Sequence, residues 1–170
     1  QLKGFLPIPG TQTMFRLGGF AKVNAIYDTS PAGNPDKLVT STIPIGAGGT
    51  DNANLDANAT RFSFEVRRPG SFGPLRFYFE NDFYGGGGTT AFRLRQVHGQ
   101  AGNTYVGYGY SAFTDSDAFP ETLDDEGPGA EPLLRLAAIR QIWEVGDGVT
   151  ATLSVEDPSS DLSLASGMAA

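Results

Sequence analysis

The 170-residue sequence contains no cysteine, which excludes disulfide bonds, thiolate metal sites and a cysteine nucleophile. It contains one histidine, His98, so a Ser-His-Asp triad or a histidine metal cluster would depend on that residue. No apolar run approaches the roughly 18 residues that a membrane-spanning helix needs. Bases are outnumbered by acids, and the formal net charge of −7 argues against a nucleic-acid partner, because phosphate binding requires a basic face. A signal peptide is not visible, and Gln1 is consistent with a mature N-terminus.

Glycine is abundant, with 23 residues, and apolar residues recur at every second position in several segments. The first such segment runs from Met14 to Tyr27, and a period of two over this length is typical of a β-strand. Six more strand-like segments follow: 59–67, 74–84, 92–98, 104–114, 134–145 and 149–156. The segment 104–114 is rich in Tyr and Gly, and its two faces are less clear than those of the others. Because no helical pattern separates them, we predict seven strands that pair as antiparallel neighbours.

The connections between these strands fall into two classes. Residues 1–13 are a Pro- and Gly-rich lead-in, and residues 158–170 carry no strand pattern. The predicted loops on one side are long or variable (29–58, 85–90 and 115–132), and the turns on the other side are tight (69–73, 101–103 and 146–148). This asymmetry is typical of an all-β, antiparallel up-and-down transmembrane β-barrel with strands over 14–157.

The two faces of the predicted strands differ strongly in charge. Eight of the twelve bases share one face: Arg16, Lys22, Arg61, Arg67, Arg76, Arg93, Arg95 and Arg140. The same face carries Glu65, Glu80, Asp82, Glu144 and Glu156, whereas the other face is rich in Phe, Leu and Val. The strands also match the roughly 9–11 residues needed to cross a bilayer at a tilt. We therefore favour a membrane barrel, with a soluble β-sandwich or lipocalin-like barrel as the alternative.

An acidic, Pro- and Gly-rich stretch, residues 113–135, separates the fifth and sixth predicted strands. Its acids are Asp115, Asp117, Glu121, Asp124, Asp125, Glu126 and Glu131. Loops of this length are usually functional or disordered. It is either a solvated surface loop or a loop folded into the mouth of the barrel, opposite the basic wall. Its carboxylates lack EF-hand spacing, so neither a metal site nor another cofactor is predicted.

Several blocks, in order along the chain, carry a family resemblance. They are LPIPGT (6–11), GGFAKVNAIYD (18–28), RFSFEVRRP (61–69), FYFENDFYG (77–85), FRLRQVHG (92–99), YSAFTD (110–115), FPETLDDEGP (119–128) and IRQIW (139–143). The chain resembles the DcaP-like subfamily of trimeric Gram-negative porins.

The resemblance implies a sixteen-stranded barrel in the bacterial outer membrane, a homo-trimer, and contact with the lipid bilayer and lipopolysaccharide. It also implies an acidic third external loop that folds inward to narrow the pore, and passage of small, often anionic solutes. The match supplies the first seven strands of such a barrel. The sequence is thus expected to be the N-terminal part of a longer porin, or a half-barrel completed by another chain.

The predicted site is a basic pore wall facing the acidic loop. The pore-lining candidates are Arg61, Arg76, Arg93, Arg95 and Arg140, and the constriction-loop candidates are Asp115, Asp117, Glu121, Asp124, Asp125 and Glu126. Such a transverse field orders dipolar solutes and favours anions at one wall, although a row of arginines can also be a solvated polar face. By their position in the alternation, Asn81 and His98 are expected on the outward side, with His98 packing at the membrane interface.

The function that the sequence favours is passive diffusion of small polar, anionic solutes through an outer-membrane porin. The alternatives are a structural or adhesive outer-membrane barrel without an open pore, or a soluble β-sandwich binding protein. An enzyme is not predicted, because nothing fixes a pair of carboxylates at catalytic spacing.

Overall fold

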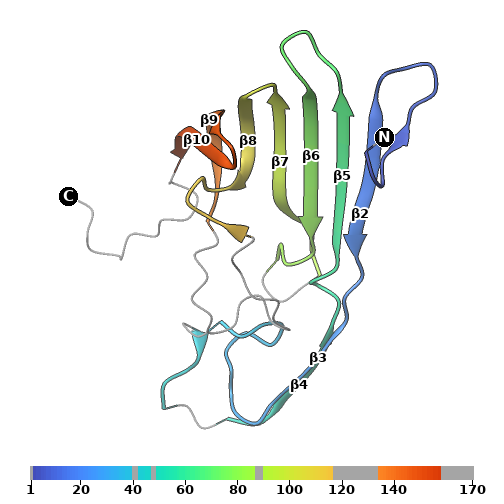
Figure 1. The fold of residues 1–170 in the computed structure, drawn as a ribbon. Helices are drawn as coiled ribbons and strands as arrows, with labels where there is room; N and C mark the ends of the chain where they lie inside the picture. Colours follow the sequence, from blue (N-terminus) through green and yellow to red (C-terminus); the bar gives the residue numbers. More distant parts are fainter. Residues whose placement is uncertain (1, 40–41, 47–48, 87–89, 117–133, 158–170) are drawn as a thin grey trace.

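The computed structural model describes residues 2–39, 42–46, 49–86, 90–116 and 134–157. The strands are β1 (Leu6–Pro7), β2 (Met14–Phe20), β3 (Asn24–Asp28), β4 (Asn52–Asp56), β5 (Arg61–Arg68), β6 (Leu75–Asp82), β7 (Arg93–Ala101), β8 (Thr104–Tyr110), β9 (Arg135–Gly146) and β10 (Val149–Asp157). Eight of them form one sheet in the order β1-β2-β5-β6-β7-β8-β9-β10, and β3 pairs with β4 separately (Figure 1). All pairings are antiparallel between neighbours in this order, which confirms the predicted up-and-down β architecture.

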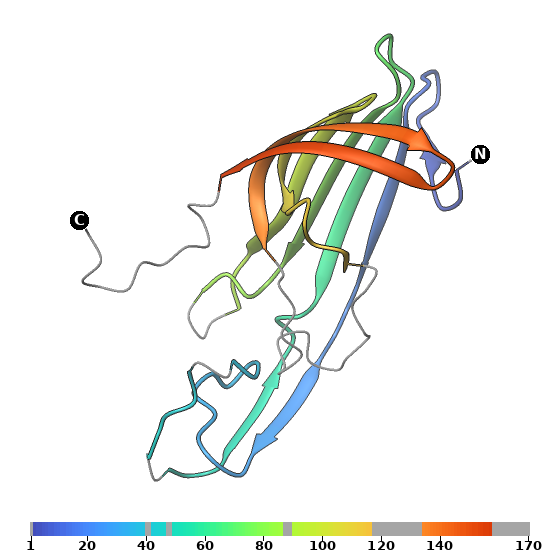
Figure 2. The same cartoon turned by 60° about the vertical axis from the view of Figure 1, so that its left-hand side comes forward.

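The sheet is strongly curved and is not closed. Figure 2 shows β9 and β10 swinging around toward the concave side of the strands that precede them. Among the described residues, β10 pairs only with β9, so its outer edge carries backbone groups without a strand partner. Within the same part of the chain, no helix is long and apolar enough to cross a membrane.

The tight turns lie at one end of the sheet, and the β3–β4 hairpin extends from the other (Figure 1). At the turn end, Gly102 and Gly148 have φ values of 55° and 76°, a left-handed conformation that glycine adopts without steric cost. Among the described residues, the tight turns therefore lie at the end opposite the β3–β4 hairpin, whereas most of the predicted loop 115–132 lies outside the described residues.

The structure corrects the prediction at the N-terminal strand. The expected strand over 14–27 is divided into β2 and β3, and β4 lies inside the segment 29–58 that was predicted to be a loop. Residues NANLD of β4 lack a long apolar alternation, so the sequence pattern did not indicate a strand. Cross-strand pairing stabilises it instead, since Asn24 faces Asp56 and Asp28 faces Asn52. The amides of both asparagines donate to those carboxylates.

The convex face of the sheet is apolar and the concave face is polar. Leu17, Phe62 and Leu153 on the convex face are 73%, 55% and 65% exposed. Glu65 and Asp82 on the concave face are each only 1% exposed. A soluble sheet would bury the first set and expose the second, so this distribution supports the membrane barrel and opposes the β-sandwich alternative.

A β-bulge at Arg95 overturns the expected position of His98. Opposite β6, Leu94 pairs with Asn81 and Gln96 pairs with Glu80, so Arg95 is an extra residue in β7. One extra residue shifts the alternation by one, which moves every later side chain of the strand to the other face. His98 therefore pairs with Tyr78 on the concave face and is 7% exposed. The predicted outward, interfacial position of His98 is wrong, whereas Asn81 keeps its convex-side position.

Candidate functional site

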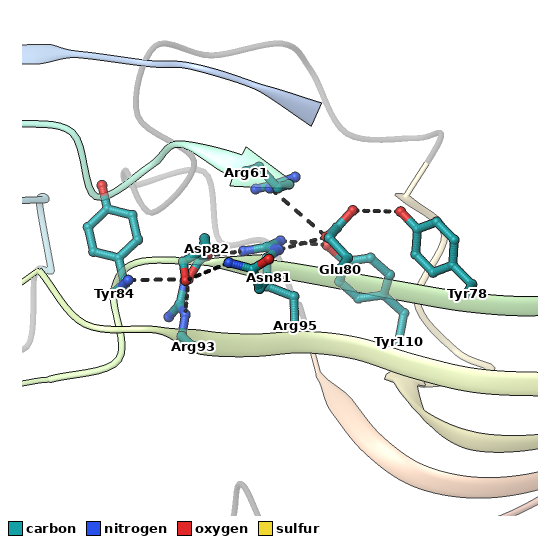
Figure 3. Close-up of polar contacts among 9 residues, drawn as sticks. All are labelled: Arg61, Tyr78, Glu80, Asn81, Asp82, Tyr84, Arg93, Arg95 and Tyr110. Atoms are coloured by element: carbon teal, nitrogen blue, oxygen red, sulfur yellow. Dashed lines mark hydrogen bonds and ion pairs between the residues drawn. The ribbon is translucent and has the colours of Figure 1, made fainter. Parts of the chain in front are cut away.

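Ion pairs cover the concave face near the end of the sheet from which β3–β4 extends. We call the group of Arg61, Arg93, Arg95, Glu80 and Asp82 the central cluster (Figure 3). Arg93 donates from Nε and Nη2 to the two carboxylate oxygens of Asp82, at 2.8 and 2.6 Å. Arg95 donates to the same Asp82 carboxylate from Nη1 at 2.8 Å. These bidentate and shared contacts have the geometry of strong charge-assisted hydrogen bonds.

Glu80 completes the central cluster. It accepts from Arg95 Nε at 2.8 Å and from the Tyr78 hydroxyl at 2.8 Å, and Arg61 Nε lies 4.0 Å away. Arg95 also donates to the Tyr110 hydroxyl at 3.0 Å. Because Arg95 is the bulged residue, its side chain reaches both Glu80 and Asp82, which lie two residues apart on β6. The bulge therefore organises the cluster.

A second group, the Glu65 cluster, lies closer to the tight turns. Glu65 accepts hydrogen bonds from Arg16 at 2.6 Å and from Arg67 and Arg76 at 2.7 Å each. The guanidinium groups of Arg16 and Arg67 also lie over the Phe5 ring, at 4.9 and 5.2 Å from its centroid. Three guanidinium groups surround one carboxylate, so this cluster carries an excess of two positive charges.

Arg140 and Glu156 form a third group, between β9 and β10. Arg140 donates to Glu156 at 2.9 Å, to the Ser154 hydroxyl at 3.2 Å and to a backbone carbonyl at the end of β8. Glu156 also accepts from the Ser111 hydroxyl at 2.7 Å and from the Ala112 amide at 2.8 Å. β8 ends at Tyr110 and is shorter than the predicted strand 104–114, although the Ser111 amide still donates to the Leu134 carbonyl at 2.8 Å. The contacts of Glu156 with Ser111 and Ala112 follow directly after this strand end. They also anchor the chain directly before the acidic stretch.

A row of aromatic rings joins the Glu65 cluster to Arg140. The rings of Tyr78 and His98 lie 5.3 Å apart, and those of His98 and Tyr105 lie 4.7 Å apart. Arg76 covers the Tyr78 ring at 5.3 Å, and Arg140 covers the Tyr105 ring at 4.8 Å. This row extends from β6 to β9. The sequence pattern did not predict it, because without the bulge the alternation places His98 on the convex face.

The five predicted pore arginines all take part in these concave-face groups, but their solvent exposure separates them. The side chains of Arg95 and Arg140 are 8% and 12% exposed, whereas those of Arg61, Arg76 and Arg93 are 23%, 34% and 24% exposed. The first two mainly hold the wall together, and the other three also present positive charge to solvent.

Sequence reasoning did not select Arg16 and Arg67 as site residues. Their side chains are 43% and 39% exposed, more than those of the selected arginines. Alternation had placed both on the polar face. The sequence feature that could have identified them is Glu65, an acid on the same face. It lies directly opposite Arg16 and two residues before Arg67. These two arginines add to the basic, partly exposed surface of the concave face.

Of the predicted acids, only Asp115 lies within the described residues, where it is exposed. Asp117, Glu121, Asp124, Asp125 and Glu126 lie outside the described residues, and so does the predicted inward fold of their loop. In the part of the chain that the structure describes, no three His, Asp or Glu side chains are grouped so that they could hold a metal ion.

Known proteins share this sequence pattern and this fold. A family model described as DcaP outer membrane protein matches residues 4–145. Among solved structures, the crystal structure of the outer membrane channel DcaP of Acinetobacter baumannii matches with a TM-score of 0.76 and 22% sequence identity. The match covers 89% of this chain and 43% of the channel's chain, so the chain spans less than half the length of that protein. No curated protein gave a significant match.

Proposed function

Because the chain belongs to the DcaP outer membrane protein family, and so to the bacterial outer membrane, we propose that it forms part of a porin. In this proposal the concave face lines the pore, and small polar, anionic solutes cross by passive diffusion. The proposal includes an assembly of three copies and contact of the convex face with lipid and lipopolysaccharide. The β-barrel fold itself is supported by the family match and by the similar solved channel.

The observation that carries the proposal is the basic, solvent-exposed wall on the concave face. Around Glu65, three partly exposed arginines outnumber one buried carboxylate. In the central cluster, three arginines meet two carboxylates. Positive charge lining a narrow aqueous path raises the local concentration of anions and lowers that of cations.

The ion pairs have a second role in this proposal, which is to hold the guanidinium groups in place. A free arginine side chain loses about 2 kcal/mol of rotamer freedom when it is fixed by a solute. Here the carboxylates of Glu65, Glu80 and Asp82 already fix the arginines. A passing anion then meets a preorganised surface without being held by it, as rapid diffusion requires.

We also propose that residues 115–132 fold inward and narrow the pore. The support is the pair of hydrogen bonds that Glu156 accepts from Ser111 and Ala112, which hold the chain shortly before this segment against the barrel wall. An acidic loop opposite the Glu65 and central clusters would set up a transverse field that orders dipolar solutes.

Planar-bilayer recording of the full-length protein tests the proposal. We expect stepwise currents and, in a KCl gradient, a reversal potential of the sign that anion preference produces. A correctly folded protein that inserts without current steps would overturn the pore and favour a structural barrel. Current steps with cation preference would retain the pore and overturn the anionic solutes.

A further inference from the structure

A shallow groove of about 580 Å³ lies on the convex face near the tight turns. Its floor is a row of four residues in register across β5 to β8, namely Val66, Phe77, Gly99 and Val106. Gly99 leaves the middle of this floor open, because it has no side chain. A Cβ added there would meet only one backbone atom, the carbonyl oxygen of Arg76, at 4.0 Å. Its volume lies within the roughly 300–1,000 Å³ of small-molecule sites.

The rim of the groove at the turn end is basic and polar. Arg68, the last residue of β5, shares the convex face with Val66 and is exposed. It makes no ion pair with any residue that the structure describes. Thr13 and Thr104 also line the groove, and the Thr104 hydroxyl donates to the Gln141 side chain at 2.9 Å. An apolar floor that ends at an exposed arginine matches a molecule with an acyl chain and an anionic head group.

Charge complementarity favours a lipid over a second copy of the chain as the occupant. A second copy would need a carboxylate on its own convex face to neutralise Arg68. Within the described strands, the register places one acid on that face, Asp157, at the end of β10 remote from the tight turns. A lipid phosphate brings its own negative charge, and it pairs with a guanidinium in a bidentate, charge-assisted manner.

We propose that this groove binds an anionic glycerophospholipid. The acyl chain lies across Gly99 between Phe77 and Val106, and the phosphate accepts hydrogen bonds from Arg68. With the tight turns on the periplasmic side, the groove opens to the inner leaflet of the outer membrane. The site rests on the membrane position of the convex face and not on whether the pore conducts.

Native mass spectrometry of the full-length protein in detergent, with dioleoylphosphatidylglycerol added, tests the site. We expect the wild type to retain this lipid and to retain dioleoylphosphatidylcholine less well. Gly99→Leu fills the groove and should abolish retention. Arg68→Gln removes the phosphate partner and should weaken binding about tenfold, as expected for one charge-assisted contact. Ala151→Leu places a leucine on the convex face of β10, away from the groove, and should behave as wild type.

Three results would overturn the proposal. The first is equal retention by Gly99→Leu and the wild type. The second is loss of lipid in Ala151→Leu as well, which indicates non-specific lipid around the barrel. The third is dissociation of the oligomer by Gly99→Leu with lipid still bound, which indicates a contact between subunits. Mobility of unboiled samples on gels reports folding. Apart from these results with the other two variants, an unchanged affinity of Arg68→Gln also rejects the site, and this measurement does not depend on the folding of Gly99→Leu.

Discussion

Replacing Arg76 and Arg95 separately by glutamine tests how exposure divides the roles of the wall arginines. The two side chains lie on the same face but are 34% and 8% exposed. In Arg76→Gln, Glu65 keeps its hydrogen bonds from Arg16 and Arg67, so the local fold has little reason to change. The variant therefore loses one solvent-facing positive charge and little stability.

The size of the selectivity change follows from Coulomb's law. A unit charge about 6 Å from a passing ion, in a water-like dielectric, contributes about 0.7 kcal/mol. This energy corresponds to a change of about threefold in the local concentration of each ion. We expect the anion-to-cation permeability ratio of Arg76→Gln to fall by at least that factor at low salt. The effect should fade near 1 M salt, where the screening length is about 3 Å.

Arg95→Gln should behave differently, because it removes hydrogen bonds to two buried carboxylates. Asp82 keeps the bidentate contact with Arg93, and Glu80 keeps the Tyr78 hydroxyl. The expected cost is therefore about 3 kcal/mol, at the lower end of the range for breaking a buried ion pair.

Reversal potentials in a KCl gradient measure the selectivity of both variants, and denaturant unfolding in detergent measures their stability. Equal stability of the two variants, or an unchanged permeability ratio in Arg76→Gln at low salt, would refute the reasoning. The first result would show that the central cluster is not a buried network, and the second that Arg76 does not face the conducting path.

Three further predictions concern the fold. For topology, single cysteines at positions 32 and 71 should differ in their labelling on intact cells by a thiol reagent that does not cross membranes. Ala32→Cys, in an external loop, should react, and Ser71→Cys, in a periplasmic turn, should not. The reverse pattern would contradict the predicted orientation of the barrel. Gly107→Ala should reduce the folded fraction, since the φ of Gly107 is +152° and an added Cβ would lie 2.5 Å from the Cα atom of His98 in β7. The control Gly99→Ala, whose Cβ would lie in open space, should fold normally. Equal yields of the two folded variants would contradict this steric argument. A protein limited to residues 1–170 should not be a soluble monomer, because its convex face is largely apolar and the edge of β10 requires a partner strand. A monodisperse monomer in detergent-free buffer, with a cooperative melt, would refute this.

Much of the architecture was predictable, because alternate residues of each strand face an apolar and a polar environment, and their types follow that alternation. Alternation with a period of two located the seven long strands, and the concentration of arginine on one face indicated the polar concave side. The exposed Phe62 and Leu153 and the buried Glu65 agree with that prediction. These features depend on local sequence alone, since a side chain's neighbours two residues away share its face.

Other features depended on which strands meet and in what register. The facing of His98 is decided by the extra residue at Arg95, and this bulge is defined only by the pairing of β7 with β6. β4 is a strand because β3 is available to pair with it. Likewise, the sequence placed Arg76 and Arg95 on one wall, but only the packing around them determines that one is open to solvent and the other closed. A bulge is a property of two paired strands, so the alternation along β7 alone does not show where the extra residue shifts its register.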